Sequence, residues 1–150
     1  MLSFLIGLFA GLRSLTAPAV IASAAHLGRL HLRGPLAWIG STAAVVILTV
    51  LAILELVADK LPGTPSRTAA PGLVARIATG ALAGACIGDA AGWSAAAGAL
   101  LGIIGALVGS FGGYQARTGL VRALGEPDTT IAVLEDAVTI AGSLWVVSRF

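Results

Sequence analysis

Long apolar runs separated by short polar joints restrict most strongly how this chain can fold. A helix needs about 20 apolar residues to cross the core of a bilayer. The sequence contains about five such runs, which cover residues 2–25, 36–57, 73–91, 94–116 and 131–147. With 57% hydrophobic and 11% charged residues, 150 residues cannot hide this surface in a water-soluble fold. We therefore expect one all-α domain over residues 1–150, a polytopic membrane helix bundle.

The first apolar run carries an arginine near its middle. If this run spans the membrane, Arg13 lies near mid-depth, where a charge costs at least about 2.5–3.5 kcal/mol and should face protein or water. Pro18 cannot donate to the carbonyl of Ser14, so we expect the helix to bend or break at Pro18. Ser14 and Thr16 can supply hydrogen bonds to the freed backbone. Two interpretations remain open: a ligand or ion pathway, and a structural tie between Arg13 and a carboxylate.

Two later runs offer carboxylates that could pair with this arginine. Glu55 and Asp59 are four residues apart, so both lie on one helical face near the membrane boundary. Glu55 is about a turn deeper and is the better predicted partner of Arg13. Glu135 and Asp136 point about 100° apart on a helix, so one can face a cavity while the other meets headgroups. Acidic residues near a helix N-terminus are also favoured by its dipole, which is a purely structural alternative.

A weak internal echo relates the two ends of the chain. Arg13 is followed in the next apolar run by Glu55, and Arg117 is followed in the next run by Glu135. Runs three apart cross a membrane in opposite directions, so such a repeat would be inverted, as in many transporters. The two pairs have very different sequence separations, and chance similarity in an Ala-rich sequence is the competing interpretation.

Glycines at helical spacing predict where the apolar helices pack. Small residues on one stripe allow two helix backbones to approach closely in a bilayer. The third run carries Gly80, Gly84 and Gly88, and the fourth carries Gly98, Gly102, Gly105, Gly109 and Gly113. We therefore expect close helix contacts through these two runs.

The joints between the runs predict loops and helix ends. Residues 61–72 are rich in Pro and Gly and predict a connector, with a lid or a re-entrant turn as alternatives. Residues 26–35 contain two histidines and two arginines and predict a loop beside lipid headgroups. The candidates for the cap of the last helix are Asp128, Thr129 and Thr130.

The sequence lacks the residues that several classes of protein function require. The net charge of +2 is small and scattered, which argues against a nucleic-acid partner. No Ser-His-Asp set, HExxH motif, paired metal-ligand motif or phosphate-binding loop is present, so we assign no catalytic residue, metal or cofactor. An enzyme acting on lipids therefore ranks last. The expected partners are the lipid bilayer, a second copy in a homodimer, and a small anionic or polar solute.

Short motifs along nearly the whole chain resemble one protein family. They are Gly-Leu-Arg at 11–13 with Pro18, residues 55–62, Arg-Thr at 67–68, and Leu-Glu-Asp at 134–136. Together these motifs resemble the bacterial small membrane proteins of domain of unknown function family 4126. The resemblance implies a compact, multi-pass protein of the bacterial inner (cytoplasmic) membrane, and it implies no catalytic assignment.

Two function hypotheses follow from these residues. The first is a transporter or channel for an anion or small polar solute, in which an intramembrane Arg/Glu cluster binds the solute. The candidate binding or ion-pathway residues are Arg13, Ser14, Thr16, Glu55, Asp59, Arg117, Glu135 and Asp136. The alternative is a non-transporting scaffold or assembly subunit, in which the same charge pairs only hold helices together.

Overall fold

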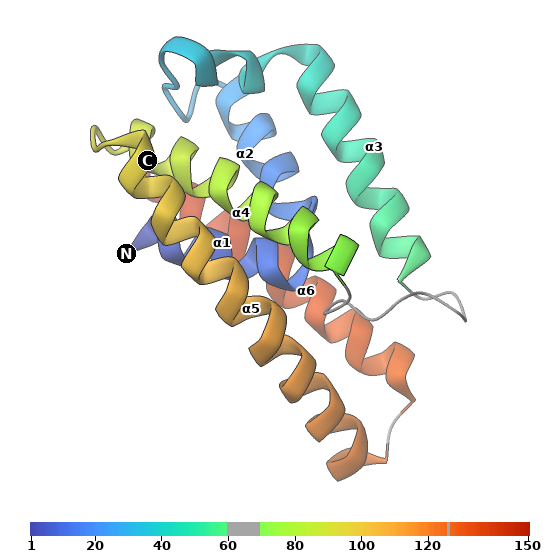
Figure 1. Ribbon diagram of the computed structural model, residues 1–150. Helices are drawn as coiled ribbons and strands as arrows, with labels where there is room; N and C mark the ends of the chain where they lie inside the picture. Colours follow the sequence, from blue (N-terminus) through green and yellow to red (C-terminus); the bar gives the residue numbers. More distant parts are fainter. Residues whose placement is uncertain (60–69, 126) are drawn as a thin grey trace.

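The computed structural model describes residues 1–59, 70–125 and 127–150, and every regular element among them is helical (Figure 1). The elements are α1 (Leu2–Leu12), α2 (Thr16–His26), the 3-10 helix η1 (Gly34–Gly40), α3 (Thr42–Ala58), α4 (Ala70–Ala90), α5 (Ala95–Leu124) and α6 (Asp128–Val147). The expected all-α class is confirmed for these residues. The predicted connector at 61–72 lies mostly outside the described residues.

The first apolar run forms two short helices instead of one span. α1 ends at Leu12, the backbone of Arg13 is extended with φ −137° and ψ 114°, and α2 begins at Thr16. The break was expected at Pro18, but it lies before this residue. Pro18 lies in the first turn of α2, where a backbone N–H has no partner within the helix, so the ring is accommodated there.

The number of spans also differs from the expectation. Among the residues that the structure describes, three helices, α4, α5 and α6, are long and apolar enough to cross a membrane. A fourth span results if η1 and α3 are counted together despite the 65° bend between them. α1 is apolar but has only 11 residues. The expected five spans are not confirmed, because Arg13 interrupts the first run and the extended Ser41 bends the second.

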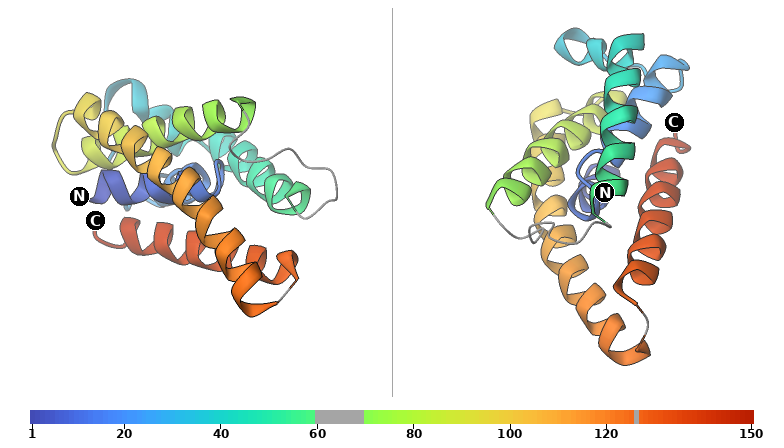
Figure 2. Two further views of the ribbon diagram at one scale, coloured as in Figure 1. Left: turned by 60° about the horizontal axis from the view of Figure 1, so that its bottom comes forward. Right: turned by 90° about the vertical axis from the view of Figure 1, so that its right-hand side faces the viewer.

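The end of α5 and the start of α6 project together from the rest of the molecule (Figure 2). α5 has 30 residues; at about 1.5 Å per residue it measures about 45 Å, more than the roughly 30 Å core of a bilayer. It continues beyond the predicted end at residue 116 and stops at Gly125, which has φ 65°. α6 begins with Asp128 and has no side-chain cap, so the predicted capping role of Asp128, Thr129 or Thr130 is wrong.

Glycines bring α1, α4 and α5 into backbone contact. A Cβ atom added to Gly102 of α5 would overlap with the carbonyl oxygen of Gly80 in α4, and one added to Gly7 of α1 would overlap with the carbonyl oxygen of Gly102. The predicted packing through the glycines of α4 and α5 is therefore present. Gly7 and Gly11 of α1 were not among the predicted positions, although they have the same four-residue spacing.

Candidate functional site

The break between α1 and α2 buries the guanidinium of Arg13 completely. Its Nη1 forms an ion pair with Oδ2 of Asp59 at the end of α3, and its Nε lies 2.6 Å from Oδ1 of Asp136 in α6. The side chains of Asp59 and Asp136 are 19% and 11% exposed. Asp59 and Asp136 hold Arg13, rather than Glu55 as the sequence suggested. We call Arg13 and its two carboxylates, together with Glu55 and Arg76, the central cluster.

Glu55 binds the start of α2 instead. Its Oε1 accepts hydrogen bonds from the backbone N of Ser14 at 2.8 Å and from the hydroxyl of Ser14 at 2.6 Å. Its Oε2 accepts a hydrogen bond from the backbone N of Leu15 at 2.8 Å. These N–H groups precede the first turn of α2, where the helix dipole also favours an anion. The carboxylate of Glu55 therefore occupies an anion-binding position, formed by these backbone N–H groups at the break between α1 and α2.

Helical spacing explains why α3 reaches both parts of this centre. Glu55 and Asp59 are one turn apart on the same face, as predicted, so one contacts the α2 terminus and the other contacts Arg13. The hydroxyl of Ser14 donates a hydrogen bond to Glu55. The sequence instead predicted a hydrogen bond from Ser14 to the freed backbone. The α3 helix therefore supplies both the cap of α2 and one counter-ion of the buried cation.

A second arginine joins the central cluster. Arg76 of α4 is only 5% exposed, its Nη2 lies 4.0 Å from Oε1 of Glu55, and its Nη1 donates to the carbonyl of Gly72 at 3.3 Å. Arg76 was not among the predicted site residues. The available signal was its position inside the apolar run 73–91, because a lone charge in such a run is expected to face other protein groups.

Arg117 and Glu135 belong to a second cluster, between the end of α5 and the start of α6. Arg117 of α5 binds Asp128 of α6 through two contacts, Nε to Oδ1 at 2.7 Å and Nη2 to Oδ2 at 2.5 Å. Nη1 of Arg117 lies 3.6 Å from Oε2 of Glu135. The side chain of Asp128 is 62% exposed, so this cluster is less enclosed than that around Arg13. Glu135 contacts Arg117 and its neighbour Asp136 contacts Arg13, as their angular separation on a helix predicts.

The two halves of the suggested repeat differ in the structure. Arg117 and Glu135 form an ion pair, whereas the ion pairs of Arg13 are with Asp59 and Asp136. The helix that carries Arg117 is also continuous, whereas the chain at Arg13 is broken. The internal echo therefore has no counterpart in pairing or in helix continuity.

A family model covers almost the whole chain. The model described as "Domain of unknown function (DUF4126)" matches residues 1–148. The chain belongs to the DUF4126 family. The resemblance inferred from the short motifs is thereby confirmed. Neither a search of curated proteins nor a search of solved structures finds a match.

Two buried polar atoms in this DUF4126 chain remain available at the break. Nη2 of Arg13 and the hydroxyl of Thr16 are buried and have no hydrogen-bond partner in the part of the chain that the structure describes. The expected hydrogen bond from Thr16 to the freed backbone is therefore missing. The same part of the chain holds no group of three or more His, Cys, Asp or Glu residues suited to a metal ion.

Proposed function

We propose that this DUF4126 protein is a multi-pass transporter or channel of the bacterial inner membrane, and that it passes a small anion or polar solute through the central cluster. The observation that carries the proposal is the Glu55 carboxylate on the N–H groups of Ser14 and Leu15. Half-helix N-termini bind anionic groups in many transporters built from broken helices. Glu55 thus stands where an anionic solute would bind.

The transport step is an exchange between Glu55 and the solute. When Glu55 takes up a proton, its oxygens become weaker acceptors and release the two backbone N–H groups at the start of α2. A solute oxygen or halide then accepts these hydrogen bonds and one from Nη2 of Arg13, which is buried and lacks a partner among the described residues. When Glu55 releases the proton to water on the opposite side of the membrane and returns to its position, it expels the solute on that side. Movement of the solute is therefore coupled to proton movement.

A scaffold or assembly subunit is the second candidate, and a different observation favours it. Arg13 joins the α1–α2 break to both α3 and α6, and glycine contacts join α1, α4 and α5. In this role the charges only hold the bundle together. Substitutions of Arg13 or Glu55 would then change stability, and the protein would pass no solute.

Flux from liposomes distinguishes the two functions. Purified protein is reconstituted into liposomes loaded with chloride or phosphate, and efflux is followed with and without a proton gradient. For the wild type we expect efflux above that of empty liposomes and a response to the gradient. Glu55→Gln should remove the response to the gradient, because an amide cannot exchange a proton. Arg13→Gln should abolish efflux.

Arg122→Gln is the matched control, because it removes the same charge from an exposed position on α5. Its efflux should equal that of the wild type. Gel filtration of each variant before reconstitution shows whether it remains folded. Folded wild-type protein with no efflux above empty liposomes contradicts transport of these ions and favours the scaffold. Unchanged, gradient-dependent efflux in Glu55→Gln removes Glu55 from the mechanism.

A further inference from the structure

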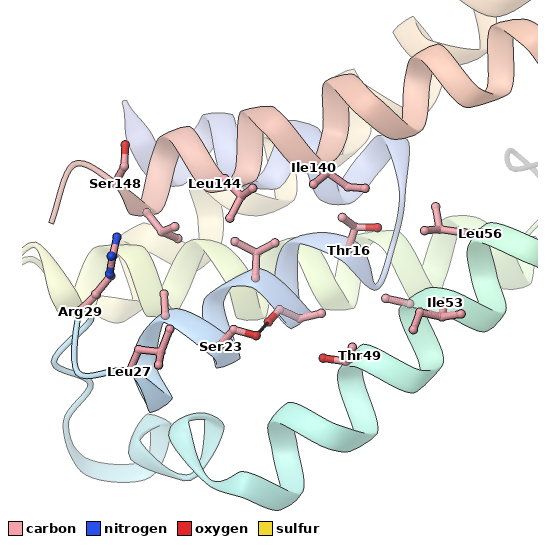
Figure 3. Close-up of a pocket in the computed structure, with 15 residues that line it drawn as sticks. Thr16, Ser23, Leu27, Arg29, Thr49, Ile53, Leu56, Ile140, Leu144 and Ser148 are labelled. Carbon is pink, nitrogen blue, oxygen red and sulfur yellow. Dashed lines mark hydrogen bonds between the residues drawn. The ribbon is translucent and has the colours of Figure 1, made fainter.

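An apolar groove of about 490 Å³ lies between α2, α3 and α6 (Figure 3). Its volume is in the range of about 300–1,000 Å³ found for ligand pockets. The lining residues are Thr16, Ala19, Val20, Ser23, Ala24, Leu27, Arg29, Thr49, Ala52, Ile53, Leu56, Ile140, Leu144, Val147 and Ser148. Most of these side chains are apolar, so the groove suits a hydrocarbon chain.

The groove has a cationic end. Figure 3 shows Arg29, from the loop after α2, and Ser148, from the end of α6, at the same end of the groove. Arg29 is exposed, and the part of the chain that the structure describes contains no ion-pair partner for its guanidinium. The loop of Arg29 also carries His31 and Arg33, and the backbone N of Arg33 donates to the carboxylate of Asp89 at 2.7 Å. The two arginines outnumber this one carboxylate, so the loop keeps a positive charge. A basic loop of this kind attracts anionic headgroups at a membrane surface.

The opposite end of the groove is formed by Thr16 and Leu56 (Figure 3). The groove thus follows α2 from its first residue to the loop beyond its end. The 11 residues of α2 correspond to about 16 Å at 1.5 Å per residue, which is a length that an acyl chain can fill. The groove therefore offers a cation at one end and an elongated apolar wall along the rest.

We infer that this groove binds one anionic phospholipid of the surrounding bilayer, with an acyl chain along α2 and the phosphate on Arg29. A free inorganic anion would use Arg29 but leave the apolar wall bare. A neutral lipid would fill the wall but leave Arg29 without a counter-ion. Only an anionic amphiphile matches both the cation and the apolar wall. This inference does not depend on transport through the central cluster.

Lipid titrations followed by native mass spectrometry test the charged end. The full chain in detergent is titrated with phosphatidylglycerol and with phosphatidylcholine that carries the same acyl chains. The wild type should prefer phosphatidylglycerol by about fivefold, because one arginine near the surface contributes about this factor. Arg29→Gln should lower the preference to about one, whereas Arg33→Gln, which changes the same loop outside the groove lining, should keep it. Equal preference in wild type and Arg29→Gln overturns the assignment of the phosphate.

A blocking variant tests the apolar wall. Thr49 is an exposed residue of α3 that lines the groove, and its neighbour Val50 is exposed but does not line it. Thr49→Trp should weaken binding of both lipids about tenfold or more by filling the groove, and Val50→Trp should leave binding unchanged. Equal lipid binding in the two variants overturns the proposal. So does a wild-type dimer that Thr49→Trp, but not Val50→Trp, dissociates, because the groove would then hold a second copy.

Discussion

At the residue scale, Arg13 is the side chain on which distant segments of the chain depend. It is completely buried and pairs with carboxylates from α3 and α6. Replacing one partner of a buried ion pair costs about 3–5 kcal/mol, because the remaining charges stay buried without compensation. We therefore expect Arg13→Gln to lower the free energy of unfolding by about this amount, as measured by denaturant titration in detergent.

A double-mutant cycle separates the ion pair from general damage at this position. Asp136→Asn alone should also destabilise the protein, and Arg13→Gln with Asp136→Asn should lose less than the sum of the two single changes. The expected recovery arises because the double variant leaves neither the guanidinium nor the Asp136 carboxylate unpaired. Strict additivity of the three free energies would show that the contact contributes nothing to stability.

Ser14 tests the binding of Glu55 at the start of α2. Its hydroxyl donates to the Glu55 carboxylate at 2.6 Å, and hydrogen bonds to charged groups contribute about 1.5–3 kcal/mol. Ser14→Ala should therefore lower the free energy of unfolding by about this amount. Ser23→Ala is the control, because the hydroxyl of Ser23 donates to the carbonyl of Ala19 within the same helix, and loss of this bond should be nearly neutral. The two variants should differ clearly in denaturant midpoint; equal midpoints are inconsistent with this role.

At the element scale, close helix packing leaves no room for a side chain at Gly102. Its Cα faces both α1 and α4, so even one added methyl group would overlap with backbone atoms of Gly80. Overpacking of this kind costs about 1–3 kcal/mol, and more where backbone cannot move aside. We expect Gly102→Ala to lower the melting temperature in detergent.

Gly112 provides the matched control on the same helix. A Cβ atom at Gly112 would meet no other group within 4 Å. Because alanine is a better helix former than glycine, Gly112→Ala should stabilise the protein by about 0.5–1 kcal/mol. Melting curves of the two variants should therefore shift in opposite directions, and a shared direction would argue against the close contact of α5 with α4.

The elements themselves were largely predictable, and the position of the first break was not. Apolar runs and glycine spacing predicted helices and their packing because both signals are local. The break was assigned to Pro18 because proline disturbs an isolated helix. In the folded chain the helix is interrupted at Arg13 to Leu15, since the carboxylate of Glu55 satisfies the N–H groups of Ser14 and Leu15. No local pattern contains that contact.

At the scale of the whole molecule, the thiol of Cys86 reports on opening of the bundle. Cys86 is 0% exposed in α4, so a maleimide can reach it only when the packing of α4 opens. We expect labelling in detergent to be at least about a hundredfold slower than for the unfolded chain. The measurement is the labelling rate by mass spectrometry with increasing denaturant.

Arg122→Cys in a Cys86→Ala background is the control for this labelling. Position 122 is exposed near the end of α5, so its thiol should react at about the rate found in the unfolded chain. Fast labelling of Cys86 under native conditions would contradict the buried position of this α4 face.

The sequence by itself determined the helical class, the apolar character of the spans, the glycine packing of α4 and α5, and the list of charged residues from which a site could be built. These properties follow from composition and from helical periodicity, which are local. Only the tertiary structure decided that Arg13 binds Asp59 and Asp136, that Glu55 binds the start of α2, and that Arg117 stands apart. The partner of a buried charge depends on where distant helices meet, and that is set by how their small-residue faces pack.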